Sequence, residues 1–194
     1  MSVKMSSFAV FLDRDGTINE DPGYLGDPNL VKLLPGVAEG ISELKSKYGF
    51  KIIVISNQAG VAKGLITLQQ VESVNKKINE LLSEQNAGID VFYYCPFHPL
   101  YNNKEETGCR KPSPYMIKKA AAENTIDLSK SYMVGDKATD ILCGFNAGVK
   151  SILINSQLTT DEINILKKEG KTPNFTTDNF LNAVNFIKQD FNKR

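Results

Sequence analysis

The stretch Phe8-Ala9-Val10-Phe11-Leu12-Asp13-Arg14-Asp15-Gly16-Thr17 decides the fold, because a short apolar run passes directly into two carboxylates. The run is continuously apolar and rich in strand-forming residues, which is typical of a strand buried in a parallel sheet. Residues two apart on an extended chain point the same way, so Asp13 and Asp15 can converge while Arg14 faces elsewhere. Two converging acids repel each other, and a divalent cation beside them removes that cost. The plain alternative is an acidic turn, since Asp and Gly are ordinary turn residues.

Length and composition set the class of protein. The 194 residues are 41% hydrophobic and 23% charged, which suits a single domain over residues 1–194. A net charge of +1 offers no basic excess to a nucleic acid or an anionic membrane. No apolar run approaches bilayer length, and the first seven residues are too short and polar for a signal peptide. We therefore expect a cytoplasmic monomer with reduced thiols at its three cysteines, Cys95, Cys109 and Cys143.

Strand and helix patterns alternate along the chain. Buried strands are expected at about 8–12, 51–56, 89–94, 132–134 and 151–154. Between them, helices are expected at 37–48, at 67–84, after an N-cap at Ser113 with Pro114 in the first turn, and before Gly148. This alternation predicts a three-layer α/β fold with a doubly wound parallel sheet and a core over about 8–155. Two helical patterns in about 156–194 are expected to pack on that core as a helical extension.

Further polar residues follow the other predicted strands, where ligands of such sheets bind. Ser56 offers a hydroxyl beside free backbone amides, which can bind phosphoryl oxygens. Arg110 and Lys111 bring two positive charges that suit a phosphate. Asp136 is a third acidic ligand for a hard cation such as Mg²⁺, and Asp140 stands one helical turn further on as support or as a helix cap. Taken singly, each feature is also explained by a turn, a solvated basic pair or a capping residue.

In this order, the motifs Asp-x-Asp-Gly-Thr, Ser-Asn, Lys-Pro and Gly-Asp-x-x-x-Asp resemble those of the haloacid dehalogenase (HAD) superfamily of phosphotransferases. The resemblance implies a Rossmann-like fold. It also implies no cap domain, since the intervals 13–56 and 56–111 are short.

The same resemblance implies a mechanism. Asp13 would be the nucleophile that forms an aspartyl-phosphate, and Asp15 the general acid and then the general base. Mg²⁺ would be held by Asp13, Asp15 (through its backbone carbonyl) and Asp136, while Ser56 and Lys111 stabilise the phosphoryl group.

The loops over about Phe8–Asn155 resemble more narrowly the D-glycero-D-manno-heptose 1,7-bisphosphate 7-phosphatase family. The resemblance implies a small phosphorylated sugar as the substrate, hydrolysed at its 7-phosphate on the route to nucleotide-heptose and lipopolysaccharide core precursors. The implied substrate contacts are Arg14, Asp21, Pro22, Gly23, Tyr24, Asn57, Gln58, Ala59, Arg110 and Lys137.

The chain departs from that family in its zinc loop. The family pattern supplies Cys-x-His and then Cys-x-Cys, but Phe97 and Thr107 stand at two of those positions. The remaining Cys95, His98 and Cys109 give three ligands at most, whereas structural zinc takes four. We therefore expect Mg²⁺ but no zinc, and a loop held by the packing of Phe97 and its neighbours.

Three other functions stay open at this point. Histidinol-phosphate phosphatase would use the same scaffold, and a polynucleotide 3′-phosphatase is disfavoured by the low net charge. A non-catalytic phosphoryl-binding module, such as a receiver domain, would not need an acid two residues after its acceptor. The Asp13 and Asp15 pair therefore favours turnover.

Overall fold

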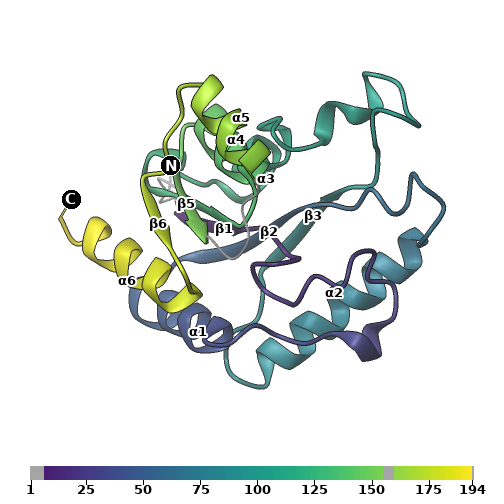
Figure 1. Ribbon diagram of the computed structural model, residues 1–194. Helices are drawn as coiled ribbons and strands as arrows, with labels where there is room; N and C mark the ends of the chain where they lie inside the picture. Colours follow the sequence, from purple (N-terminus) through teal and green to yellow (C-terminus); the bar gives the residue numbers. More distant parts are fainter. Residues whose placement is uncertain (1–6, 155–159, 194) are drawn as a thin grey trace, which may run out of the picture.

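The computed structural model describes residues 7–154 and 160–193, and its centre is one parallel sheet (Figure 1). The strand order is β3-β2-β1-β4-β5-β6, and every neighbouring pair is parallel. The strands are β1 (Ala9–Leu12), β2 (Lys51–Asn57), β3 (Val91–Cys95), β4 (Tyr132–Gly135), β5 (Lys150–Ile154) and β6 (Phe175–Thr177). Because the order reverses at β1, the sheet is doubly wound, as the sequence predicts.

Helices cover both faces of this sheet. They are α1 (Val37–Tyr48), α2 (Leu68–Ser83), α3 (Tyr115–Asn124), α4 (Ala138–Ala147), α5 (Thr160–Lys168) and α6 (Phe180–Phe191). Figure 1 shows α1, α2 and α6 on one side and α3, α4 and α5 on the other. The longest, α2, has 16 residues, and no helix in the described part of the chain is long and apolar enough to cross a membrane.

Successive side chains of a strand point to opposite faces of the sheet, which divides the core into two layers. Val10 and Leu12 of β1 pack in the cluster that contains the apolar faces of α1, α2 and α6. Ala9 and Phe11 point the other way, into the cluster built with α3 and α4. All four side chains are fully buried, as expected for a central strand with helices on both faces. The three-layer prediction is confirmed.

Two helix ends follow from local sequence. Thr67 and Gln70 form a capping box before α2, with Gln70 N donating to Thr67 Oγ1 at 3.2 Å and Thr67 N donating to Gln70 Oε1 at 2.8 Å. Helix α4 ends at Gly148 in the left-handed conformation, at φ 82°. The predicted N-cap at Ser113 is wrong by one residue. Pro114 is the N-cap of α3, because its carbonyl accepts the first helical hydrogen bond, from Lys118 N.

The C-terminal segment adds a strand as well as helices. The sequence predicts the two helical patterns that become α5 and α6, but β6 between them was not predicted. Three residues are too few to show a periodicity, and their pairing with β5 depends on a contact distant in the chain. Helix α6 packs closely on α1 at Gly40, where an added Cβ would lie 2.8 Å from Val184.

Loops gather at the carboxyl ends of β1, β2 and β3. In the described residues, the connections 13–36, 58–67 and 96–114 contain loops with the short 3-10 helices η1 (Pro28–Leu30) and η2 (Glu106–Cys109) rather than a separate folded unit. These loops therefore form the walls above the strand ends.

Candidate active site

A cavity of about 490 Å³ opens above the carboxyl ends of the central strands. Most of the residues predicted for the site line it, namely Asp13, Asp15, Asp21, Gly23, Tyr24, Ser56, Asn57, Gln58, Ala59, Arg110, Lys111 and Lys137. Arg14, Pro22 and Asp136 do not line it. Five further lining residues were not predicted as parts of the cavity wall, namely Lys63, His98, Thr139, Asp140 and Glu162. Of these, Asp140 follows from the Gly-Asp-x-x-x-Asp spacing, whereas Glu162 lies far beyond any motif.

We define the floor as Asp13, Lys111 and Asp140 of the cavity wall together with the adjacent Asp136. It contains a buried ion-pair triad. Lys111 Nζ lies 2.5 Å from Asp13 Oδ1 and 2.6 Å from Asp140 Oδ1, and it also donates to the carbonyl of Ile55 at 2.7 Å. Burial raises the pKa of Asp13 to about 6, although the Lys111 charge opposes the rise. Burial disfavours the charged Lys111 as well, but the two carboxylates outweigh it and raise the pKa of that amine. Lys111 is thus a fixed cation beside the Asp13 carboxylate.

The floor fits a divalent cation. Carboxylate oxygens of Asp13, Asp136 and Asp140 lie within 4.8 Å of one another, and among the described residues Asp136 Oδ1 is buried without a hydrogen-bond partner. Burial, together with the charges of Asp13 and Asp140, raises the pKa of Asp136 to about 8. Three carboxylates against one Lys111 leave an excess of negative charge, and carboxylate oxygens are the ligands that Mg²⁺ prefers.

Gly16 makes room for this arrangement. It has φ 86°, and a Cβ there would lie 2.4 Å from Asp136 Oδ2. The backbone of the Asp13–Thr17 turn can therefore approach Asp136 only with glycine at this position.

Asp15 belongs to a separate hydrogen-bond network. Arg14 Nη2 donates to Asp15 Oδ2 at 2.8 Å and Arg14 Nε to Asp15 Oδ1 at 3.0 Å, and Asn19 and Gln58 add donors at 3.0 and 2.9 Å. Burial alone would raise the pKa of Asp15, but the Arg14 guanidinium outweighs it and holds this pKa below its ordinary value. The Asp15 side chain is not part of the three-carboxylate cluster, and its predicted backbone ligand role stays a prediction.

Arg14 lies outside the cavity wall, and its predicted contact with substrate stays a prediction. The side chain is fully buried and does not line the cavity. Its remaining donors go to Asn75 Oδ1 of α2, at 3.0 Å, and to Gln58 Oε1, at 3.1 Å. Arg14 faces away from Asp13, as strand alternation predicts, but it then turns back to orient the Asp15 carboxylate.

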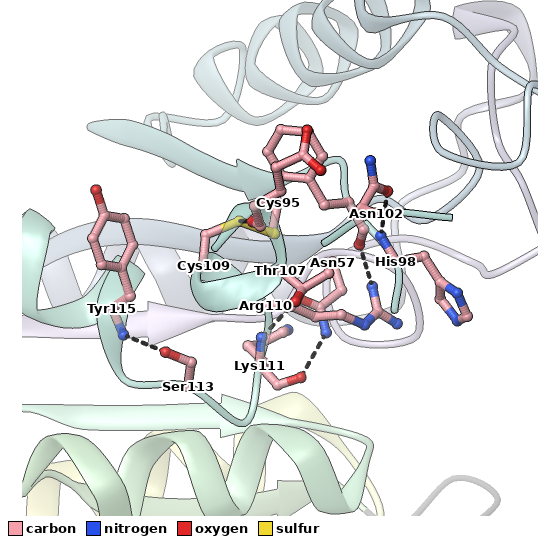
Figure 2. The surroundings of a disulfide bond; sticks show 12 residues. Asn57, Cys95, His98, Asn102, Thr107, Cys109, Arg110, Lys111, Ser113 and Tyr115 are labelled. Carbon is pink, nitrogen blue, oxygen red and sulfur yellow. Dashed lines mark hydrogen bonds between the residues drawn. A yellow bond between two sulfur atoms is a disulfide. The ribbon is translucent and has the colours of Figure 1, made fainter. Parts of the chain in front are cut away.

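The residues at the end of β2, with Gln58 directly after it, also use their polar atoms within the protein. Ser56 is buried, and its hydroxyl accepts from Gln58 Nε2 at 2.6 Å. Asn57 donates to the Lys111 carbonyl at 3.1 Å and accepts from Lys111 N at 2.9 Å (Figure 2). Gln58 contacts Arg14, Asp15 and Ser56. Asn57 therefore holds the backbone of Lys111 and Gln58 holds the Asp15 carboxylate, and their predicted substrate contacts remain a hypothesis.

The opposite wall is cationic. We call Tyr24, Lys63, His98 and Arg110 the rim. Lys63 donates to the Tyr24 hydroxyl and lies 4.9 Å from the centre of its ring. His98 Nδ1 accepts from Leu100 N at 3.3 Å, which places the proton of the neutral ring on Nε2. Desolvation, with the positive charges of Arg110 and Lys63, lowers the pKa of His98. On the facing side, Lys137 and Asp21 pair at 3.2 Å.

The cysteine prediction is wrong in part. Cys95 and Cys109 form a disulfide rather than two reduced thiols, and Figure 2 shows it beside the segment that carries Arg110 and Lys111. Cys143 is a free thiol buried on α4, as predicted. Phe97 packs against the same core cluster as Cys95, so the predicted packing of this loop is also present.

The three candidate zinc ligands, Cys95, His98 and Cys109, are not arranged to bind zinc. The sulfurs of Cys95 and Cys109 are bonded to each other, and zinc takes thiolates. The His98 ring points away from the disulfide in Figure 2, and its Nδ1 is already engaged by Leu100 N. Of the described residues, only Asp13, Asp136 and Asp140 bring three potential metal-ligating side chains together.

Comparisons with known proteins agree with this geometry. The Hydrolase_like family model, described as HAD-hydrolase-like, matches residues 108–183. The D-glycero-D-manno-heptose-1,7-bisphosphate 7-phosphatase of Chlorobaculum tepidum is 39% identical over 188 residues, which cover 92% of this chain and 93% of that protein. The D-glycero-beta-D-manno-heptose-1,7-bisphosphate 7-phosphatase of Escherichia coli K12 is 38% identical over 159 residues, covering 79% and 83%.

Among solved structures, D,D-heptose 1,7-bisphosphate phosphatase from B. bronchiseptica, complexed with magnesium and phosphate, has the same fold. Its TM-score is 0.79 at 24% identity, with 94% of this chain and 99% of that chain covered. Fold, floor and relatives together define a phosphatase of the HAD superfamily, a phosphoric monoester hydrolase. Within that superfamily, the chain belongs to the D-glycero-D-manno-heptose-1,7-bisphosphate 7-phosphatase family.

Proposed function

We propose that this enzyme removes the 7-phosphate of D-glycero-D-manno-heptose 1,7-bisphosphate through an aspartyl-phosphate on Asp13. The observation that carries the proposal is one cavity with cationic side chains at two separate places. The floor places a carboxylate against a buried lysine, and the rim presents Lys63, His98 and Arg110. The names of the Chlorobaculum tepidum and Escherichia coli relatives support this substrate.

In the first half-reaction, a carboxylate oxygen of Asp13 attacks phosphorus while the bond between phosphorus and the sugar oxygen breaks. Lys111 Nζ, 2.5 Å from Asp13 Oδ1, stabilises the negative charge that the phosphoryl oxygens bring to the floor. Asp15 gives its proton to the leaving sugar oxygen. Arg14 holds the pKa of Asp15 below its ordinary value in the free protein, and the negative charge of a bound phosphate would act in the opposite direction.

In the second half-reaction, water attacks the phosphorus of the aspartyl-phosphate, and Asp15 takes the proton from that water. The bond from phosphorus to Asp13 breaks, and Asp13 returns to its carboxylate. Asp13, Asp136 and the Asp15 carbonyl would hold Mg²⁺, with Asp140 beside them. Mg²⁺ when bound supplies positive charge that lets an anionic nucleophile meet an anionic phosphate. The B. bronchiseptica structure holds magnesium and phosphate, which supports this assignment.

The charges of the rim favour a bisphosphate substrate rather than histidinol phosphate. In the described part of the chain, neither Lys63 nor Arg110 forms an ion pair with a carboxylate, so both charges face the cavity without an internal counter-ion. A second phosphate would supply that counter-charge. The ammonium group of histidinol phosphate would instead meet cations, which costs free energy.

A substrate panel tests the proposal. Initial rates with Mg²⁺ are measured on both anomers of heptose 1,7-bisphosphate, histidinol phosphate, fructose 1,6-bisphosphate and a 3′-phosphorylated oligonucleotide. We expect the highest kcat/KM for a heptose bisphosphate, with release of one phosphate from carbon 7. A higher kcat/KM for histidinol phosphate would replace the proposed substrate.

A further inference from the structure

The disulfide joins a rigid part of the protein to a loop. Cys95 ends β3, is fully buried, and pairs with Asn57 in the sheet; its carbonyl accepts from Gln58 N at 2.8 Å. Cys109 ends η2, 14 residues further on, with its Cα 5.7 Å from that of Cys95. The loop between them is mostly exposed, with Leu100 at 80% exposure. The bond therefore fastens an exposed loop to a fixed point of the sheet.

Two substrate-facing residues follow Cys109, and they differ in how much else holds them. Lys111 is fixed by both hydrogen bonds to Asn57, by two buried ion pairs and by the Ile55 carbonyl. Its position does not depend on the disulfide.

Arg110 has weaker anchors. Its side chain donates to the carbonyl of Phe97 at 3.3 Å, its amide donates to the Thr107 carbonyl at 2.9 Å, and its own carbonyl accepts from Ser113 N at 2.9 Å. The Phe97 and Thr107 carbonyls belong to the loop that the disulfide closes, so the contact of the Arg110 side chain moves with the loop, whereas the Ser113 contact holds only the Arg110 backbone. The backbone joins the start of this loop to β3, and the disulfide adds a covalent connection from the far end of the loop, at Cys109, to the same point of the sheet.

We propose that Cys95 and Cys109 are positioning residues for Arg110, and that their bond sets the affinity of the rim for a second phosphate without setting the rate of phosphoryl transfer. The proposal rests on the proposed function, because it concerns the residue that would bind the non-reacting phosphate. Preorganisation explains the effect, since a loop already held in its bound geometry loses less entropy when it binds. The bond would do the work that four zinc ligands cannot do here, because Phe97 and Thr107 are not ligands.

The first test counts thiols and needs no substrate. Protein purified without reductant is unfolded in guanidinium and titrated with a thiol reagent. Three cysteines less two in the disulfide leave one thiol, that of Cys143, and reduction before titration raises the count to three. Three thiols without reduction, or stoichiometric zinc by elemental analysis, would overturn the proposal.

The second test separates KM from kcat. Wild-type protein before and after reduction, and the Cys95→Ala/Cys109→Ala variant, are assayed on heptose 1,7-bisphosphate and on heptose 7-phosphate. We expect KM for the bisphosphate to rise about ten-fold, the scale of one charge-assisted contact, with kcat changed by less than about two-fold. The parameters for the monophosphate should hardly change, and the buried Cys143→Ala is the matched control. Far-ultraviolet circular dichroism checks that each protein is folded.

The arginine is then tested directly. Arg110→Ala alone should raise KM for the bisphosphate to a similar extent, and adding the two cysteine substitutions should raise it no further, because both act on one contact. An unchanged KM after complete reduction contradicts the proposal, and so does an equal loss of kcat on both substrates. If the monophosphate is hydrolysed and the bisphosphate is not, the proposed substrate fails while the thiol count still stands.

Discussion

The floor and the rim of the cavity are built in different ways. The floor residues Asp13, Lys111 and Asp140 are almost fully buried and lie at or beside strand ends, and both carboxylates pair with Lys111. The rim residues come from three loops and are partly exposed, with Tyr24 at 46%. Rigid burial suits charges that must be held in place during phosphoryl transfer, whereas loops can change without disturbing that chemistry. Under the proposed function, the floor and Asp15 would carry the reaction, and the rim would select the substrate.

The largest expected effect comes from the nucleophile. Asp13→Asn should lower kcat by at least about ten-thousand-fold, because an amide cannot form the covalent intermediate. Burial raises the pKa of Asp13 to about 6, so its charge destabilises the metal-free folded protein above that pH. The thermal midpoint of the metal-free variant at pH 7.5 should therefore not fall. Normal turnover by Asp13→Asn would show that another group attacks phosphorus.

Removal of Mg²⁺ should cause the second largest loss of turnover. The floor has three carboxylates and one lysine, so EDTA should abolish turnover and added Mg²⁺ should restore it. Mg²⁺ should also raise the thermal midpoint, because it binds the folded floor and not the unfolded chain. Asp136→Asn should weaken both responses. Equal rates in EDTA and in Mg²⁺ would remove the metal from the mechanism.

A smaller effect on kcat is expected when the residue that holds Arg14 against Asp15 is changed. Asn75→Leu removes the acceptor of Arg14 Nη1 and loosens the guanidinium that orients Asp15. We expect kcat to fall about ten-fold, or about 1.4 kcal/mol in barrier height, with little change in KM. Ser73→Ala, on the same helix but outside this network, is the matched control. A lower thermal midpoint with an unchanged kcat would show that Asn75 stabilises the fold but does not help to orient Asp15.

The smallest effect on activity is expected from a substitution in the rim. Lys63→Ala should raise KM for the bisphosphate about five- to ten-fold and leave kcat unchanged, because one cation is lost far from the reacting bond. The monophosphate should be unaffected. A fall in kcat on both substrates would place Lys63 in the floor's chemistry instead.

The same division explains what sequence could predict. Asp13, Asp15, Ser56, Lys111 and Asp136 stand in short motifs directly after buried strands, and parallel strand ends meet at one edge, so their convergence follows from pattern and topology. The strands and the three-layer architecture follow from apolar runs and helical periods in the same way.

The remaining features depend on contacts between distant residues. The burial of Arg14 against Asn75 of α2 could not be predicted, because no local pattern shows that α2 lies beside this side chain. The Cys95–Cys109 bond and strand β6 join residues whose distance in space is set by the finished fold. Lys63 and His98 lie in loops whose sequences carry no period, so only the folded walls show that they share a cavity with Arg110.

The most direct test of this division measures kcat/KM for heptose 1,7-bisphosphate and for heptose 7-phosphate, in the wild type and in Lys63→Ala/Arg110→Ala. The wild type should prefer the bisphosphate by about a hundred-fold, the scale of two charge-assisted contacts. The double variant should lose most of that preference through KM while keeping its kcat. Equal kcat/KM for the two substrates in the wild type, or a double variant that keeps the preference, would contradict the separation of chemistry and recognition between floor and rim.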